Sequence, residues 1–265
     1  MTGVARLGDV VYVACGRYPT IRRFSATTYQ RLADARVNNT IERFLGDVTD
    51  VVACERTSDI YVAECRVIFT ALIWRMSADG AHISPWLRES PKFKPWTLSL
   101  TKSRLLVTLG KELTQYDVPS GRKLNRVLLP DDMDARHAVE SPTGTFVVGH
   151  ANKRLNHGQV SEVSALGRLL RQFSYSLGGL TQYIAVDSRG NIFVADPDDG
   201  HILLLDARLA LRRVIIGAHQ LNNRKPQRLC YTQHSGQLLV GLDFHGHVAV
   251  FDVLYRHRWT FNIKW

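Results

Sequence analysis

The chain has 265 residues, of which 45% are hydrophobic and 22% charged, and its formal net charge is +10. This composition is typical of a globular protein and excludes a disordered one. No apolar run reaches the roughly 18 residues that a membrane span requires, and the first residues lack the cationic and apolar regions of a secretion signal. The sequence therefore predicts a soluble, cytoplasmic protein without a membrane partner. A basic surface attracts acidic partners, nucleic acid above all.

A pattern of four short strands repeats six times along the chain. It is clearest in residues 182–216, where apolar strands alternate with polar turns such as residues 188–191. The second strand of each unit has a valine at its centre, and these valines recur at intervals of about 40 to 50 residues, the length of a propeller blade. In chain order they are Val13, Val62, Val107, Val148, Val194 and Val240.

The third strand of each unit is equally regular. These strands are expected at residues 21–24, 73–76, 113–116, 160–163, 202–205 and 248–251. A serine or aspartate follows each of them, and a short polar side chain at this position can accept backbone hydrogen bonds that start the next turn. These residues are Ser25, Ser77, Asp117, Ser164, Asp206 and Asp252.

Six small four-stranded sheets cannot each bury two faces alone, so they must pack face to face around a central axis. The sequence thus predicts an all-β fold, a single six-bladed β-propeller of four-stranded antiparallel blades over residues 1–265. The six valines are expected to lie buried between blades. Ring closure should join a short first blade, residues 4–37, to a last blade that ends in residues 258–263. No segment shows sustained helical periodicity.

The fifth unit resembles the NHL repeat. The resemblance rests on an apolar pair and an aspartate in residues 184–187, a Gly-Asn turn and Val-Ala-Asp strand end in residues 190–196, and the turn into isoleucine in residues 200–202. NHL propellers occur in TRIM-NHL proteins, so the resemblance implies a cytoplasmic protein that binds RNA or protein through one face of the ring. The RING and B-box modules of those proteins have no counterpart here, so any role in ubiquitin transfer would be substrate recruitment.

The binding surface is expected on the face where the loops between second and third strands meet the loops between blades. Cations interleaved with aromatic rings on this face suit single-stranded RNA, whereas Asp131, Asp132, Asp134, Asp198 and Asp199 interrupt the basic field. We therefore expect a protein or peptide partner, with RNA as the alternative. The candidate binding residues are Arg17, Tyr18, Lys92, Lys94, Trp96, Lys153, Arg154, Arg224, Lys225, Arg228 and Phe244.

Catalysis and metal binding have weaker support in the sequence. Calcium-dependent lactonases are related six-bladed propellers and keep a hydrolase as a less favoured alternative, but a calcium site needs several carboxylates around the channel. The matched strand ends supply only two, Glu64 and Asp196. The chain has no Gly-x-Ser-x-Gly elbow, and His245 and His247 lack further zinc ligands. We expect a monomeric, non-enzymatic scaffold without a metal or cofactor.

Overall fold

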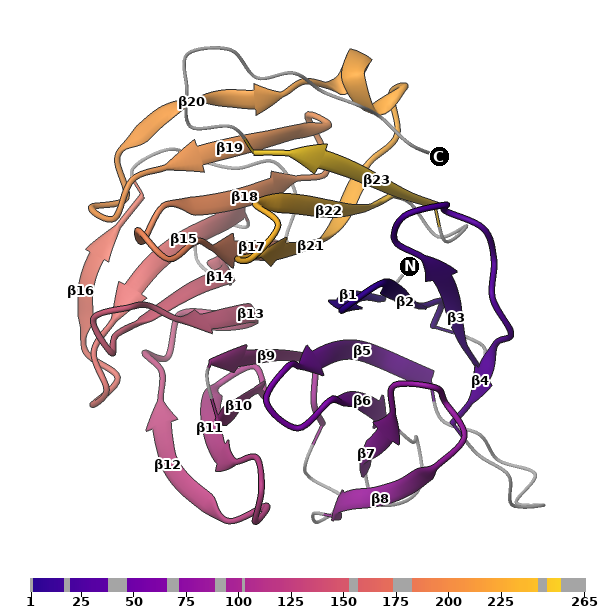
Figure 1. The fold of residues 1–265 in the computed structure, drawn as a ribbon. Helices are drawn as coiled ribbons and strands as arrows, with labels where there is room; N and C mark the ends of the chain where they lie inside the picture. Colours follow the sequence, from indigo (N-terminus) through magenta and orange to yellow (C-terminus); the bar gives the residue numbers. More distant parts are fainter. Residues whose placement is uncertain are drawn as a thin grey trace.

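The computed structural model describes residues 2–16, 20–37, 47–65, 72–88, 94–101, 103–152, 157–173, 183–242 and 247–253. Within these ranges the chain forms six antiparallel sheets of consecutive strands and one 3₁₀ turn, Ala218–Leu221. The sheets stand around a central axis as the blades of a propeller, with the first strand of each blade innermost (Figure 1). The predicted six-bladed all-β propeller is thereby confirmed.

The first three blades are built from twelve strands. They are β1 (Gly3–Leu7), β2 (Val10–Ala14), β3 (Thr20–Ser25) and β4 (Ala35–Arg36); β5 (Asp47–Cys54), β6 (Asp59–Cys65), β7 (Leu72–Ser77) and β8 (Ile83–Arg88); and β9 (Thr97–Thr101), β10 (Arg104–Thr108), β11 (Glu112–Asp117) and β12 (Lys123–Leu128).

The last three blades complete the ring, and the described part of blade 6 contains three strands. The predicted fourth strand of that blade lies outside the described residues. The strands are β13 (Met133–Glu140), β14 (Phe146–Asn152), β15 (His157–Val163) and β16 (Leu169–Gln172); β17 (Tyr183–Val186), β18 (Ile192–Asp196), β19 (His201–Leu205) and β20 (Leu211–Ile216); and β21 (Pro226–Thr232), β22 (Gln237–Leu242) and β23 (His247–Asp252).

Among the described residues, the core consists of six apolar clusters, one between each pair of neighbouring blades. Every valine of the repeat is completely buried, and each belongs to a different cluster, which confirms the expected register. Val13, for example, packs with Leu239 and Val250 between blade 1 and blade 6. Apolar side-chain packing therefore closes the ring at this seam. In the described residues, blade 1 and blade 6 share no strand pairing.

In blades 1 to 5 the polar residue that ends or follows the third strand starts the outer turn as predicted. The carboxylate oxygen Oδ1 of Asp206 accepts hydrogen bonds from the backbone N–H groups of Arg208 and Ala210, each at 2.9 Å. Ser25, Ser77, Asp117 and Ser164 accept backbone N–H groups in the same way. Asp252 instead accepts from the side chain of Gln237.

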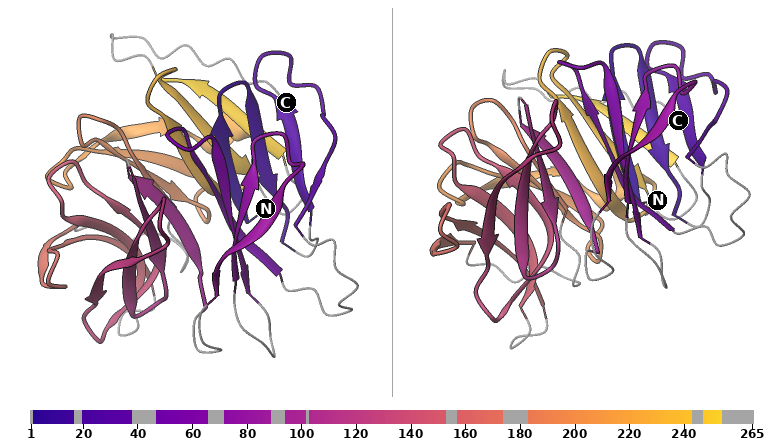
Figure 2. Two further views of the ribbon diagram at one scale, coloured as in Figure 1. Left: turned by 60° about the horizontal axis from the view of Figure 1, so that its bottom comes forward. Right: turned by 90° about the horizontal axis from the view of Figure 1, so that it is seen from below.

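The ends of the strands form two opposite faces of the ring. Figure 2 shows the ring tilted and seen from below, so that the two faces can be told apart. We call the "loop face" the side that carries the loops between second and third strands and the connections between blades. The opposite side, which carries the turns between first and second strands, is the "turn face". In the described residues no helix has the length and the apolar character needed to cross a membrane.

Candidate binding surfaces and the central channel

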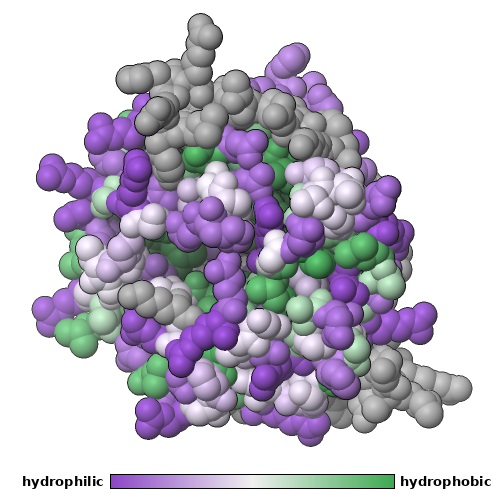
Figure 3. All heavy atoms as spheres, viewed as in Figure 1, coloured by the Kyte–Doolittle hydropathy of each residue, from purple (hydrophilic) through white to green (hydrophobic). Residues whose placement is uncertain are grey.

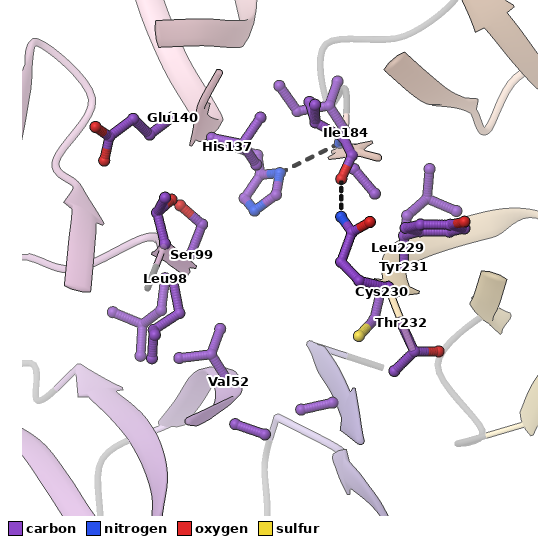
Figure 4. Close-up of a pocket in the computed structure, with 18 of the residues that line it drawn as sticks. Val52, Leu98, Ser99, His137, Glu140, Ile184, Leu229, Cys230, Tyr231 and Thr232 are labelled. Carbon is purple, nitrogen blue, oxygen red and sulfur yellow. Dashed lines mark hydrogen bonds between the residues drawn. The ribbon is translucent and has the colours of Figure 1, made fainter. Parts of the chain in front are cut away.

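A channel of about 940 Å³ runs along the propeller axis and is lined by the six innermost strands. Its lining extends to turns between first and second strands, which include Arg56, Gln233 and residues 141–144. The channel therefore opens on the turn face, opposite the face on which the sequence places the binding surface. Figure 4 shows His137 and the thiol of Cys230 projecting into this channel from different blades.

The other end of the channel is closed by polar contacts between successive inner strands. The carboxylate of Asp50 on β5 accepts a hydrogen bond from the backbone N–H of Leu98 on β9, at 2.9 Å. The hydroxyl of Thr97 on β9 donates to the carbonyl of Arg136 on β13, at 2.9 Å. Each contact joins the first half of one inner strand to the first half of the next and so holds neighbouring blades together at this end.

His137 on β13 makes the corresponding contact to blade 5. Its Nδ1 accepts a hydrogen bond from the backbone N–H of Ile184, at 3.2 Å, which requires this nitrogen to be unprotonated. Burial, reinforced by the positive charge of Arg228, lowers the pKa of His137 to about 3. The ring is therefore neutral at physiological pH and serves as a structural hydrogen-bond acceptor.

Arg228 on β21 completes this closure and contacts blades on both sides of its own. Its Nη2 donates to the carbonyl of Thr49 at 3.0 Å, its Nε donates to the carbonyl of Thr2, and its guanidinium carbon lies 3.7 Å from the ring centroid of Tyr183. Nε is 3.8 Å from the carboxylate of Asp50. We call Asp50, Thr97, His137, Tyr183 and Arg228 the "axial belt".

The belt holds a buried carboxylate and a buried guanidinium close together. Burial raises the pKa of Asp50 to about 6, although Arg228 and the backbone N–H groups of Leu98 and Val51 oppose this shift. Burial also raises the pKa of the Cys230 thiol to about 11, which keeps it protonated and poorly nucleophilic. Asp50 and Arg228 are therefore suited to holding inner strands together.

The structure corrects the predicted position of Arg228. It was expected among the loop cations, but it lies in an inner strand with only 7% of its surface exposed. Lys94, Trp96, Arg224 and Lys225 do lie in connections between blades. The other predicted binding residues lie outside the described residues: Arg17, Tyr18, Lys92, Lys153, Arg154 and Phe244.

The most distinctive group on the loop face surrounds Trp96, which is 47% exposed. The guanidinium of Arg136 stacks on its ring with the carbon 4.9 Å from the centroid, and Asp134 holds that guanidinium at 3.2 Å. A Cβ atom on Gly110 would lie 3.1 Å from Asp134 and 3.7 Å from Trp96, so the backbone of a neighbouring loop closes the group. We call Trp96, Gly110, Asp134 and Arg136 the "Trp96 shelf".

Arg136 was missed by the sequence reasoning because it lies inside a strand rather than a loop. The signal that could have found it is the spacing of Asp134 and Arg136, which are two residues apart and therefore share a strand face. Elsewhere on the loop face, Lys225 lies 3.6 Å from Asp198, which confirms that the two kinds of loop adjoin. Asp198 and Asp134 thus lie beside cations, as expected from the sequence.

The strand ends considered for metal binding have other partners. Glu64 accepts a hydrogen bond from the indole N–H of buried Trp74 at 2.7 Å, and Oδ1 of Asp196 accepts one from the backbone N–H of Asp199 at 3.5 Å. The described residues contain no group of three or more His, Cys, Asp or Glu side chains arranged to hold a metal ion.

No protein-family model matches the sequence, and no curated protein matches it. Many solved structures share the fold. Hydrazine synthase from Kuenenia stuttgartiensis matches with a TM-score of 0.63 and 14% identity, covering 94% of this chain and 82% of that chain. A Bacteroides caccae protein of unknown function matches with a TM-score of 0.65 and 14% identity, covering 92% and 90%.

A chain of a mitotic checkpoint complex also matches, with a TM-score of 0.61 and 12% identity, covering 95% of this chain and 76% of that chain. At such low identities the similarity establishes the architecture and carries no information about activity or partners. The chain is an all-β, six-bladed propeller whose blades are mostly four-stranded and antiparallel.

Proposed function

We propose that this chain is a non-enzymatic binding module that holds a protein or peptide partner on its loop face, with the Trp96 shelf at the centre of the contact. The exposed, cation-backed ring of Trp96 is the observation that carries the proposal. Tryptophan and arginine are the residues most enriched at interface hot spots, because each buries a large surface and retains polar contacts. The shelf presents both side by side.

The charges around the shelf favour a protein over a polyanion. Arg136 is neutralised by Asp134, and Lys225 lies beside Asp198, so these cations do not form a continuous basic strip. A protein surface can match such alternating charges and gain specificity from them. A polyphosphate backbone would meet repulsion from each carboxylate.

RNA binding is the second candidate, favoured by the net charge of +10 and by an aromatic ring available for base stacking. It would agree with the resemblance of the fifth blade to NHL repeats. Under either candidate we place the protein in the cytoplasm as a monomeric scaffold, and a substrate-recruiting role of the TRIM-NHL kind would be one form of the first.

The test begins with affinity capture, using the wild-type chain and its Trp96→Ala variant as parallel baits. Candidate partners lost with the variant are purified, and their dissociation constants are measured by calorimetry. We expect Trp96→Ala to weaken binding at least 30-fold, about 2 kcal/mol, as for an interface hot spot. Arg56→Ala, an exposed site on the turn face, is the control and should leave affinity unchanged. Equal affinities of a correctly folded Trp96→Ala variant and wild type for every partner would refute the proposal.

A parallel titration with mixed-sequence RNA at 50 and 200 mM salt distinguishes the second candidate. Binding driven by phosphate contacts weakens steeply with salt, with a log-log slope of roughly −0.7 per neutralised phosphate on a single strand. Tight, salt-dependent RNA binding that Trp96→Ala abolishes would favour the RNA candidate. Absence of RNA binding at low salt would remove it.

A further inference from the structure

Exposed apolar side chains are concentrated on the outer strands of three neighbouring blades. Among the described residues, every exposed large hydrophobic side chain except Trp96 lies on β12, on β16 and the turn before it, or on β20. Their exposed fractions range from 41% for Leu124 to 79% for Leu166. Isolated exposed leucines need no explanation, but a contiguous group often marks an interaction surface. The group comprises Leu124, Leu128, Leu166, Leu169, Leu170, Leu211 and Val214.

These strands adjoin one another along the circumference of the ring. A Cβ atom on Gly167, in the turn before β16, would lie 1.9 Å from the carbonyl oxygen of Leu128, at the end of β12. Nη1 of Arg171 on β16 donates to the carbonyl of Ala207, in the turn before β20, at 3.3 Å. The three strands thus form one continuous surface at the periphery (Figure 1). We call this surface, residues 121–128, 166–172 and 207–214, the "rim band".

The rim band also has unpaired strand edges. Among the described residues, β12, β16 and β20 are each the last strand of their sheet, so one side of each backbone has no strand partner there. All four residues of β16 are exposed, and its pairing with β15 is short and interrupted by a bulge. Figure 3 shows hydrophobic side chains standing out among hydrophilic ones along the left edge of the ring, where Figure 1 places these blades. An exposed, apolar edge is a template for an added strand.

The charge of the rim band identifies the kind of partner. All three of its segments contain arginine and none contains Asp or Glu. Arg126 and Arg171 pair with Glu112 and Glu162 on the neighbouring third strands β11 and β15, and Arg212 pairs with Asp206. Arg168, in the turn before β16, is exposed and makes no ion pair within the described part of the chain.

We propose that the rim band is a second interaction surface, distinct from the loop face, which binds an extended acidic segment of a partner protein as a strand added to β16. Leucine or valine at every second position of the segment would pack on Leu166, Leu169 and Leu170, and glutamate or aspartate between them would meet Arg168. Strand addition supplies affinity through backbone hydrogen bonds and specificity through alternate side chains. A second copy of this chain is disfavoured because two rims of the same positive charge repel one another.

The probe is a fluorescein-labelled peptide of alternating Glu with Leu or Val, eight residues long, with its titration followed by fluorescence anisotropy. Its control has the same composition with the four Glu residues grouped at one end, which preserves the charge and removes the alternation. We expect the alternating peptide to bind at least tenfold more tightly than the control. Leu166→Ser combined with Leu170→Ser, and separately Arg168→Glu, should each weaken binding at least tenfold, while Trp96→Ala leaves it unchanged. Equal binding of the two peptides would overturn the proposal.

Two further measurements keep the test decisive if a variant folds poorly. Hydrogen exchange of the wild-type chain with the alternating peptide should show slower exchange of the amides in residues 168–172, and unchanged exchange there would refute strand addition. Sedimentation with vesicles of phosphatidylcholine and phosphatidylserine tests a membrane as the ligand. Vesicle binding that the leucine variants abolish, without peptide binding, would assign the rim band to lipid instead. Concentration-dependent self-association by sedimentation velocity would assign it to a second copy.

Discussion

Replacing Arg228 with methionine should destabilise the whole ring, because this residue joins four blades. Methionine retains an unbranched apolar side chain but removes the hydrogen bonds to Thr2 and Thr49, the contact with the Tyr183 ring and the positive charge beside Asp50. Removing one partner of a buried ion pair costs about 3–5 kcal/mol, and the cation–π contact adds about 1–2 kcal/mol when desolvated. These contributions overlap, so we expect the free energy of unfolding to fall by about 4 kcal/mol.

Equilibrium unfolding in urea, followed by tryptophan fluorescence, measures this loss. Adding Asp50→Asn to Arg228→Met should restore part of the lost stability. The asparagine oxygen can still accept the hydrogen bond from the backbone N–H of Leu98, and the unpaired buried charge disappears. We expect a coupling energy of at least ~1 kcal/mol between the two substitutions. Lys225→Met is the matched control, since its cation lies in an exposed pair with Asp198, and it should cost ~0.5 kcal/mol or less. A loss for Arg228→Met no larger than that of the control would refute the role assigned to the axial belt.

Three further predictions concern the belt, the rim and the core. In His137→Asn the amide oxygen can replace Nδ1 as the hydrogen-bond acceptor, and the asparagine does not titrate. In wild type the native pKa of His137, about 3, lies below the free value of 6.5. The free energy of unfolding of wild type alone should therefore decrease through this group as pH falls from 6.5 to 3. The difference in free energy of unfolding between wild type and His137→Asn, measured by urea titration, should therefore change by about 2 kcal/mol between pH 7 and pH 5. A difference that does not change with pH would contradict a neutral buried histidine. Gly167→Ala should cost at least ~1 kcal/mol more than Gly144→Ala, because both have positive φ but only Gly167 faces a backbone oxygen, that of Leu128; equal melting temperatures would exclude that contact. Val194→Asp should abolish cooperative thermal unfolding, since an unpaired carboxylate in a completely buried position costs several kcal/mol, and a wild-type melting curve would show that the register is wrong.

The repeat was predictable because its signals are local. A valine in an apolar strand and a Ser or Asp at the following turn obey the same short-range rules in every blade, and the structure confirms them at Val194 and Asp206. The axial belt has no such signature, because its inner-strand residues differ from blade to blade and meet only after the ring closes. Arg228 was misplaced for this reason: it follows Pro226 and nearby basic residues, which together resemble a loop.

The direction in which the channel opens was equally inaccessible to the sequence. Both faces carry polar loops, and only the contacts of Asp50, His137 and Arg228 show which end is closed. The Trp96 shelf could be predicted only in part. Trp96 was identified from its aromatic character and its place between two blades, whereas its support by Arg136 depends on a contact between different blades that no local pattern specifies.

The seam between blade 6 and blade 1 has a consequence for the order in which the chain can fold during synthesis. Arg228 donates to the carbonyls of Thr2 and Thr49, which are synthesised 226 and 179 residues before it. During synthesis, the apolar surface of blade 1 around Val13 therefore stays exposed to solvent until Leu239 and Val250 have been made and can cover it. Contacts so distant in sequence form late and slowly. Nascent chains that stop before blade 6 should depend on chaperones, and a permuted gene that starts at another blade boundary should move that period of exposure to a different pair of blades.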